Sequence, residues 1–236
     1  MKKSILLFLI SMLATSNLLS FSGNGSGTEE DPFQITNVKQ LQEIDLDIEA
    51  YYILMNDIDA EETKFWNNID HDNDSTTSMI PTGFVPLTKW ENARQIIFDG
   101  KDHVIKKLFI YLPKERDVGL FSYSSIYSEI RNVRLENCLI TGARNVGSLV
   151  GRNTGRVINS YASGKVTGNI CLGGLVGVNS SAIVKSSADV ELIIEINRGT
   201  NGSAGGLVGV NGGDVSLSHS YGIIKGDYEV KDNNHY

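Results

Sequence analysis

The chain has 236 residues, of which 41% are hydrophobic and 21% are charged, and its formal net charge at pH 7 is −7. This length is enough to bury the core of one substantial domain. The acidic balance, without a basic cluster, disfavours nucleic acids and anionic membrane surfaces as partners.

The first 22 residues have the pattern of a secretory leader. Two lysines near the start precede an apolar run from Ile5 to Leu13, and small residues before Gly23 offer a cleavage point. The run is too short to span a membrane. We expect residues 1–22 to be a cleaved signal peptide, with an uncleaved anchor as the alternative. The remaining chain, with 19 basic and 28 acidic residues and hence a charge of −9, is then secreted or at the cell surface, without membrane insertion.

Residues 23–50 read as a lead-in that ends in a short capping helix. Thr36 is a suitable N-cap, and Val38, Leu41 and Ile44 fall along one helical face. Such a helix would cover the first coil of a stacked structure, whose open strand edge would otherwise invite association. The segment from residue 51 onwards then begins with a strand.

The polar stretch over residues 61–77 is expected to be a long loop, with Trp66 folding back onto the core. Within it, Asp70, Asp72 and Asp74 alternate as in the opening of an EF-hand calcium loop. The match stops there, because the sixth and twelfth positions hold Ser and Pro where that loop needs Gly and Glu. We interpret the stretch as a solvated acidic loop, leave weak Ca²⁺ binding open, and assign no metal site and no cofactor.

A short glycine-flanked phrase returns along the second half of the chain. Its full copies are Gly147–Gly151, Gly173–Gly177 and Gly205–Gly209, and a fainter copy covers Val118–Ser122. The leucines of successive copies are 29, 26 and 32 residues apart. Each full copy is followed by a turn-prone Asn, an apolar residue and a Ser-Tyr or Ser-Ser pair. Internal repeats of this length indicate one coil of a solenoid per copy.

Strands of four or five residues bury their inward side chains only when another coil stacks on them at about 4.8 Å. We therefore predict an all-β fold, a right-handed parallel β-helix (β-solenoid) over residues 51–236, with repeats at about 117–144, 145–170, 171–203 and 204–230. Leu120, Leu149, Leu175 and Leu207 should form one inward column. Helical repeats are disfavoured because Gly recurs inside every unit; 17 of the 24 glycines lie between residues 147 and 226, where we expect them to shape sharp corners.

The two cysteines lie in consecutive repeats but at different offsets from the column leucines. Cys138 is 18 residues after Leu120, and Cys171 is 22 residues after Leu149. Export would permit a disulfide. The unequal offsets argue against direct stacking, so two buried free thiols are favoured over a disulfide.

The repeated phrase and the Asn and Ser-Tyr that follow it resemble the GLUG motif of large bacterial surface and secreted proteins. The segments Asp31–Ile35, Leu54–Asp59 and Phe98–Ile105 resemble the usual lead-in to such repeats. This resemblance covers about residues 25–228. In that family the motif occurs in the non-catalytic part of some immunoglobulin A peptidases and in filamentous-haemagglutinin-like adhesins. It therefore implies a scaffold and not an activity.

No motif for catalysis is evident, so no catalytic residue is assigned and the protein is expected not to be an enzyme. Zinc peptidases need two histidines one helical turn apart with an adjoining Glu, whereas His71, His103, His219 and His235 are far apart in sequence. A β-helix polysaccharide lyase or hydrolase remains an alternative, because arginines from neighbouring coils could converge with Asp and Glu. The arginines concerned are Arg131, Arg134, Arg144, Arg152 and Arg156.

The favoured function is an adhesin-like binding protein whose outward Ser, Thr, Asn and Tyr side chains contact glycans or host and matrix proteins. Tyr161 and Tyr221, which occupy equivalent places in two repeats, are the candidate contact residues. The alternative to a binding face is a structural spacer, or the truncated repeat region of a larger surface protein.

Overall fold

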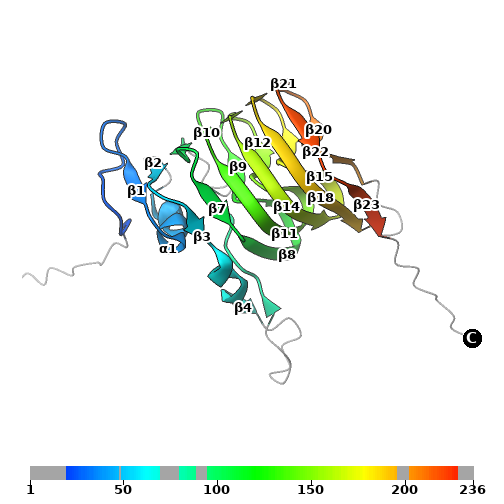
Figure 1. Cartoon of the computed structure of the whole chain (residues 1–236), viewed down its shortest axis with the longest axis horizontal. Coiled ribbons are helices and arrows are strands. Elements are labelled where there is room, and N and C mark those ends of the chain that lie inside the picture. The colour runs from blue at the N-terminus through cyan, green and yellow to red at the C-terminus, as the bar shows by residue number, and fades with distance from the viewer. Residues whose placement is uncertain (1–19, 48, 70–79, 89–94, 196–201, 228–236) are drawn as a thin grey trace, which may run out of the picture.

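A computed structural model of the chain describes residues 20–47, 49–69, 80–88, 95–195 and 202–227. Its strands stack along the long axis of the molecule as a parallel β-solenoid, which confirms the predicted fold class (Figure 1). The one α-helix of these described residues lies at the N-terminal end of the stack and β23 at the other end. Three sheets form the sides of the solenoid, and the chain passes from sheet to sheet at its corners.

The first side is a seven-stranded sheet in which each strand pairs in parallel with the equivalent strand of the next coil. Its strands, in order, are β1 (Phe33–Ile35), β2 (Tyr51–Leu54), β6 (Ile97–Asp99), β10 (Glu129–Arg131), β13 (Arg156–Ile158), β17 (Ala182–Val184) and β21 (Asp214–Ser216). The ladder thus begins at β1, within the segment expected to be a lead-in.

The other two sides are a ten-stranded and a four-stranded parallel sheet. The ten-stranded sheet contains β3 (Ile58–Asp59), β7 (Val104–Lys106), β8 (Phe109–Val118), β11 (Arg134–Gly147), β14 (Tyr161–Gly168), β15 (Ile170–Gly173), β18 (Ser187–Glu195), β19 (Ala204–Gly205), β22 (His219–Tyr221) and β23 (Ile224–Asp227). The four-stranded sheet contains β9 (Phe121–Ser124), β12 (Val150–Asn153), β16 (Val176–Asn179) and β20 (Val208–Asn211).

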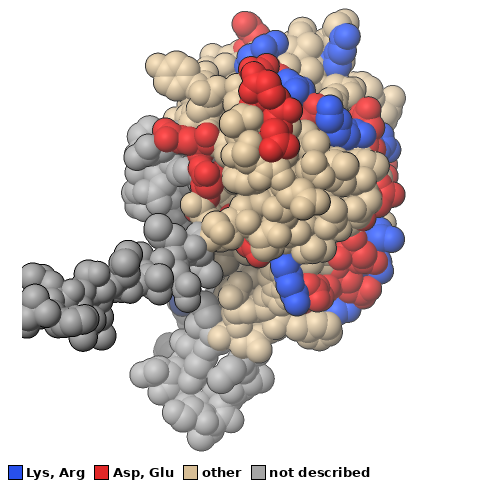
Figure 2. All heavy atoms as spheres, turned by 90° about the vertical axis from the view of Figure 1, so that its left-hand side faces the viewer, with Lys and Arg blue, Asp and Glu red and all other residues tan. Residues whose placement is uncertain are grey.

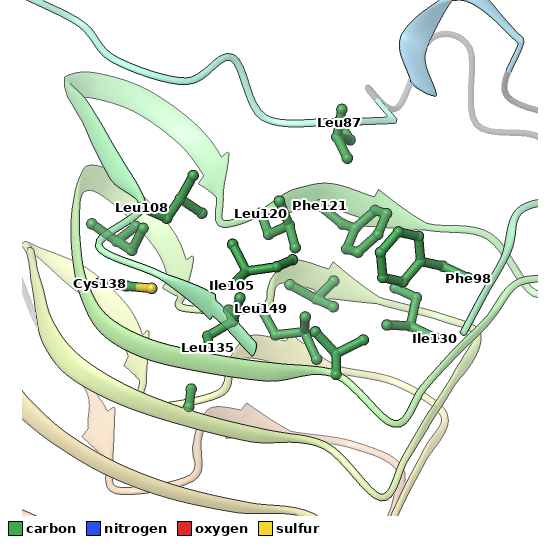
Figure 3. Packing of buried hydrophobic residues seen from close by; sticks show 14 of the residues in the cluster. Leu87, Phe98, Ile105, Leu108, Leu120, Phe121, Ile130, Leu135, Cys138 and Leu149 are labelled. Atoms are coloured by element: carbon green, nitrogen blue, oxygen red, sulfur yellow. The ribbon is translucent and has the colours of Figure 1, made fainter. Parts of the chain in front are cut away.

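The predicted leucine column is present. Leu120, Leu149 and Leu175 are each 0% exposed, and Leu207 is partly buried against them in the last described coil. The Leu149 N–H donates to the carbonyl of Leu175, and the Leu175 N–H donates to that of Leu207. Figure 3 shows Leu120 and Leu149 pointing into the same interior as side chains from the other two sheets. Burial of these side chains by the coil above is what holds such short strands together.

The glycines of the repeated phrase have a different role from the one expected. None of Gly147, Gly173 and Gly205 has a positive φ, so they do not supply left-handed corners. They allow close backbone approach instead: a Cβ at Gly173 would lie 1.9 Å from the carbonyl oxygen of Val176. Atoms cannot approach this closely, so only Gly fits where two segments of backbone meet.

Left-handed backbone at the corners is supplied mainly by residues other than Gly. Asn132, Asn159, Lys185 and Leu217 stand at the same corner of successive coils, each with φ between 46° and 53°. Asn tolerates this conformation better than most residues, whereas Lys and Leu adopt it at a cost. Stacking therefore holds a backbone shape that the local sequence alone does not favour.

The turn-prone asparagines that follow each phrase form a ladder along the solenoid. The Nδ2 of Asn153 donates to Oδ1 of Asn179 at 2.7 Å, and the Nδ2 of Asn179 donates to Oδ1 of Asn211 at 2.8 Å. Each also donates to a carbonyl two residues on in its own coil, Gly155 for Asn153 and Ser181 for Asn179. Because Asn153 and Asn179 are fully buried, these bonds are needed to satisfy their amides.

A short helix covers the N-terminal end, as expected. In α1 (Val38–Gln42) and the following 3₁₀ turn η1 (Glu43–Leu46), Val38, Leu41 and Ile44 are buried. The N-cap is Asn37 and not Thr36, because Asn37 Oδ1 accepts the N–H groups of Lys39 and Gln40. Thr36 lies one residue earlier, and its N–H donates to Oε1 of Gln40.

Two residues of the predicted leader also contact this end. Phe21 is 8% exposed and packs against Phe33 and Tyr52, with ring centroids 4.7 and 5.6 Å apart. The N–H of Ser22 donates to a carboxylate oxygen of Glu43 at 2.8 Å. Cleavage before Gly23 would remove both contacts.

The polar stretch after β3 contains the 3₁₀ turn η2 (Glu61–Phe65), and beyond it β4 (Asn68–Ile69) pairs antiparallel with β5 (Ile80–Pro81). Trp66 packs on the core and stacks on Phe84 with ring centroids 6.3 Å apart, as predicted. In the described parts of the chain, no helix has the length and apolar character needed to cross a membrane.

Both cysteines are free thiols, as favoured. Cys138 is fully buried, and burial raises the pKa of its thiol to about 12. The expectation that both would be buried is wrong for Cys171, which is half-buried. It lies within β15, where its backbone has φ 58°.

Candidate binding face on the ten-stranded sheet

The outward side of the ten-stranded sheet carries aromatic and hydroxyl side chains in register. Arg134, Tyr161, Ser187 and His219 stand in one row across four successive coils, because β11, β14, β18 and β22 pair in parallel. A second row contains Tyr111, Thr141, Thr167 and Ile193. We call the lateral face the surface formed by Phe109, Tyr111, Leu139, Thr141, Tyr161, Ser163, Thr167, Ser187, Ile193, His219 and Tyr221.

The aromatic rings of the lateral face lie near its two ends and in its middle. The rings of Phe109 and Tyr111 are stacked, with centroids 6.4 Å apart and planes at 11°. The guanidinium of Arg134 lies over the ring of Tyr161 at 5.2 Å from its centroid. The rings of His219 and Tyr221 meet edge to face at 5.1 Å. The face therefore offers ring surfaces that are already ordered by neighbours.

Charged side chains stand beside the residues of the lateral face, among them two pairs of opposite sign and the exposed Asp189, which is in register between Ser163 and Tyr221. The Nζ of Lys225 lies 2.5 Å from a carboxylate oxygen of Glu191, and this hydrogen bond lowers the pKa of Glu191. Arg134 lies 3.4 Å from Glu136. Exposed pairs of this kind contribute little to stability, but each pair neutralises its own two charges.

A separate charged ladder lies on the outside of the seven-stranded sheet. The Nε of Arg131 donates to Asp99 at 3.0 Å and its Nη1 donates to Glu129 at 2.6 Å. Arg156 donates to the other oxygen of Glu129 at 2.8 Å. Burial raises the pKa of Asp99, but hydrogen bonds from Asn132, the Lys101 N–H and Arg131 outweigh it and hold this pKa below its ordinary value. Both arginines are thus neutralised by carboxylates of neighbouring coils.

The arginines considered for a polysaccharide-cleaving site are spread over all three sides of the solenoid. Arg131 and Arg156 lie on the seven-stranded sheet, Arg134 and Arg144 on the ten-stranded sheet, and Arg152 on the four-stranded sheet. Arg152 pairs with Asp117 at 3.3 Å. The structure therefore does not bring these five side chains together.

Two of the histidines are described, and they lie in different places. His103 precedes β7 and contacts Asp57 at 3.3 Å, whereas His219 is in β22, in the last described coil. Asp70, Asp72 and Asp74 lie outside the described residues. Among the residues that are described, no group of three or more His, Cys, Asp and Glu could hold a metal ion.

A hollow of about 330 Å³ lies beside the start of α1, with four carboxylates among its lining residues. Asp57 accepts a hydrogen bond from the N–H of Val104. This bond, together with His103, lowers the pKa of Asp57, although desolvation acts in the opposite direction. Glu61 accepts from Lys107 and Lys64, and these bonds lower its pKa to about 2. Asp57 and Glu61 are therefore already engaged by other residues of the protein. Figure 2, which views the N-terminal end, shows acidic and basic residues side by side at the top and along the right-hand edge, with mostly uncharged surface between these groups.

The sequence did not point to Phe109 and Tyr111 as part of an outward face. Phe109 and Tyr111 alternate with the buried Leu108 and Ile110, and this strand-like alternation is the sequence signal that could have placed them on the outward face. Tyr161 and Tyr221, which it did indicate, both lie on the lateral face, two coils apart. The expectation that they occupy equivalent places is wrong: two coils on from Tyr161 the register position is held by His219, and Tyr221 is in register with Ser163.

The stacked parallel coils, the inward leucine column and the asparagine ladder define a β-solenoid repeat protein. The family model of the GLUG motif matches residues 142–167, which include the first full copy of the repeated phrase and the Asn and Ser-Tyr after it. The chain therefore carries the GLUG motif, and the resemblance seen in the sequence is confirmed.

Two known proteins are similar to the chain over most of its length. Halomucin from Haloquadratum walsbyi is 34% identical over an alignment of 176 residues, and the match covers 70% of this chain and 2% of halomucin. The chain thus spans only about 2% of the length of this relative. A crystal structure of a candidate immunoglobulin A1 protease from Bacteroides ovatus superposes with a TM-score of 0.59 and 20% identity, covering 84% of this chain and 70% of that one. This second likeness concerns the fold alone.

The GLUG motif and the halomucin likeness indicate a cell-surface or secreted protein. The two similar proteins come from an archaeon and a bacterium, so the bacterial origin expected from the sequence stays a prediction. The signal peptide and the domain boundaries also stay predictions.

Proposed function

We propose that the protein is a non-catalytic binding protein of the cell surface or the extracellular medium, and that it contacts glycans or matrix proteins through the lateral face. The observation that carries this proposal is the set of outward aromatic and hydroxyl side chains that stand in register on successive coils, such as Tyr161 beside Ser187 and Thr141 beside Thr167. A flat face built on strands holds such groups rigidly.

Glycans fit this face best on chemical grounds. Sugar rings combine apolar C–H surfaces with hydroxyl groups, and Tyr offers an apolar ring together with a polar end. Ser and Thr hydroxyls can both donate and accept hydrogen bonds. Neighbouring coils repeat these groups at the strand spacing of about 4.8 Å, which suits a chain of repeated sugar units. The paired charges of Lys225 with Glu191 favour an uncharged ligand.

The absence of catalysis is part of the proposal. It is supported by the likeness to halomucin and by the pairing of Arg131 and Arg156 with carboxylates on a side of the solenoid away from the lateral face. Arginines held in this way are less available to a substrate anion than free ones. A spacer role is the second candidate, favoured by the asparagine ladder that ties successive coils together.

Residues 20–236, which keep every described residue, can be screened on a glycan array and on immobilised matrix proteins. Tyr161→Ala should weaken the binding found, because it removes the central ring of the lateral face. Tyr127→Ala is the matched control, since Tyr127 is 70% exposed but lies between β9 and β10, away from this face. Equal effects of the two substitutions, or no binding by a folded protein, would contradict the proposal; the latter would favour the spacer.

A further inference from the structure

Two arginines stand side by side on the ten-stranded sheet. Arg116 of β8 and Arg144 of β11 are register partners in the parallel ladder, and both are exposed. Like charges directly opposite each other destabilise a sheet. In the other register pairs whose two described side chains are both charged, the signs are opposite, as for Glu129 and Arg156. The fold thus keeps an electrostatic cost between Arg116 and Arg144 that it avoids elsewhere.

A β-bulge brings Arg116 to this position. The ladder pairs Leu112 with Gly142 and next Arg116 with Arg144, so residues 113–115 of β8 stand opposite one residue of β11. Bulges re-aim side chains and are common beside functional sites. Natural proteins break local structural rules mainly where a function requires it. The bulge and the like-charged pair together therefore point to a ligand.

A third arginine reaches the same region from the four-stranded sheet. The backbone of β12 passes so close to the end of β8 that a Cβ at Gly151 would lie 2.4 Å from the carbonyl carbon of Asp117. The Nε of Arg152 lies 3.3 Å from one carboxylate oxygen of Asp117, and the Nε of Arg116 lies 3.6 Å from the other. Within the described parts of the chain, Arg144 has no ion-pair partner. One carboxylate thus serves two of the guanidinium groups and the third has none.

The surface formed by these side chains is positive although the chain is acidic. We call it the basic corner, and it consists of Lys114, Arg116, Arg144 and Arg152. With Glu115 and Asp117 included, this region has four basic and two acidic residues and hence a charge of +2. The whole chain carries −7. The sequence does not reveal the cluster, because its members come from three separate strands.

We propose that the basic corner binds the carboxylate groups of an acidic polysaccharide, at a site separate from the lateral face. A guanidinium group offers a planar fork of N–H donors that matches the two oxygens of a carboxylate. Arg116 and Arg144 are one strand spacing of about 4.8 Å apart, so a carboxylate between them contacts both. Its negative charge offsets the repulsion between the two arginines.

The modest charge of the basic corner selects among anionic polymers. Duplex nucleic acids carry one negative charge per roughly 1.7 Å and depend on many cationic contacts. The acidic remainder of this chain repels such a dense array of charge. A polysaccharide with a carboxylate on only some of its sugar units can place one at the basic corner while its uncharged units pass over the neighbouring surface.

The test compares dextran with lightly carboxymethylated dextran of the same length, because these polymers differ only in their carboxylates. Binding of each labelled polymer to residues 20–236 is followed by fluorescence anisotropy at low salt. Arg116→Gln and Arg144→Gln should each weaken binding of the carboxymethylated polymer about tenfold, since each removes a charge-assisted hydrogen bond. Arg156→Gln is the matched control and should bind like the unaltered chain. It makes the same change of charge, and Arg156 and Arg116 are 59% and 63% exposed, but Arg156 lies on the seven-stranded sheet.

Equal weakening by all three variants, or equal binding of the two polymers, would overturn the proposal. The Tm of the free Arg144→Gln variant should match or exceed that of the unaltered chain, because the like-charged pair is gone. A marked fall in this Tm would give Arg144 a structural role and contradict the proposal.

Two further measurements separate the polysaccharide from other occupants and sites. Acetate at the same carboxylate concentration should not displace the carboxymethylated polymer, which is held through several charges at once; displacement would mean a site for free ions and would overturn the polysaccharide. Tyr161→Ala should leave binding of this polymer within about twofold of the unaltered chain. Loss of binding in Tyr161→Ala but not in Arg144→Gln would place the polymer on the lateral face and refute the basic corner.

Discussion

Truncation of Leu175 to Ala should destabilise the solenoid strongly. Leu175 is 0% exposed and lies between Leu149 and Leu207 in the inward column. Leu→Ala at such a site costs about 2 to 5 kcal/mol, through lost burial and the cavity that remains. This is a large part of the roughly 5 to 15 kcal/mol that holds a domain folded. For a chain of this size, the Tm should fall by roughly 4 to 20 °C.

Two further leucines make the experiment quantitative. Leu207→Ala should cost less than Leu175→Ala, because Leu207 is partly exposed in the last described coil. Leu139→Ala should cost below about 1 kcal/mol, because Leu139 is 50% exposed on the outside of the ten-stranded sheet. Urea and thermal unfolding followed by circular dichroism measure all three. Equal losses at positions 175 and 139 would refute the inward column and with it the proposed stacking.

Three other substitutions or truncations test separate parts of the structure. Gly173→Ala should lower the Tm sharply, because the added Cβ would lie 1.9 Å from a carbonyl oxygen. Gly212→Ala is the control and should change the Tm little, because the atom nearest to its Cβ would be 3.7 Å away. Equal Tm shifts would contradict the view that Gly173 is required for close backbone approach. Asp99→Asn should lower the Tm at pH 7, and the Tm difference between the variant and the unaltered chain should shrink as the pH falls below about 4. The reason is that a carboxylate whose pKa is lowered by folding stabilises the protein above its unfolded pKa and loses this effect as it protonates. A Tm difference that persists unchanged at pH 2 would argue against this role of the Asp99 carboxylate. Finally, a chain starting at Gly23 should be less stable than one starting at Ser20 by about 1.5 to 3 kcal/mol, because it lacks the buried ring of Phe21; equal Tm values of the two chains would contradict this contribution.

The repeat pattern predicted the architecture well because burial in stacked coils constrains the same position of every unit. Leu120, Leu149, Leu175 and Leu207 could be aligned from sequence alone, and the structure stacks them. The face of the capping helix was also predictable, since Val38, Leu41 and Ile44 follow helical periodicity. Its N-cap was misplaced by one residue, because Thr36 and Asn37 both suit that position.

Other features depend on contacts between coils that a single repeat does not reveal. The repeat pattern singled out Gly173, but the predicted reason, a corner conformation, was wrong. Its close approach to Val176 arises only when the backbone folds back on itself. Leu217 has φ 51°, which its residue type argues against. Asn153 and Asn179 were predicted only as turn-prone residues, whereas stacking buries them in a hydrogen-bonded ladder.

The candidate face was predicted only in part for the same reason. Tyr161 and Tyr221 were suggested by their place in the repeat, but which other residues share their side of the solenoid follows from strand register. The grouping of Tyr111 with Thr141 and Thr167 needs the pairing of β8, β11 and β14.

The claim that the protein binds without catalysing is tested most directly by analysing the ligand itself. Each glycan or matrix protein retained by residues 20–236 would be incubated with the protein at catalytic and at equimolar ratios and then examined by mass spectrometry. The account predicts that the ligand is recovered intact at both ratios. Cleavage products that form with the unaltered protein, and that disappear in a folded Arg131→Ala or Arg156→Ala variant, would contradict it.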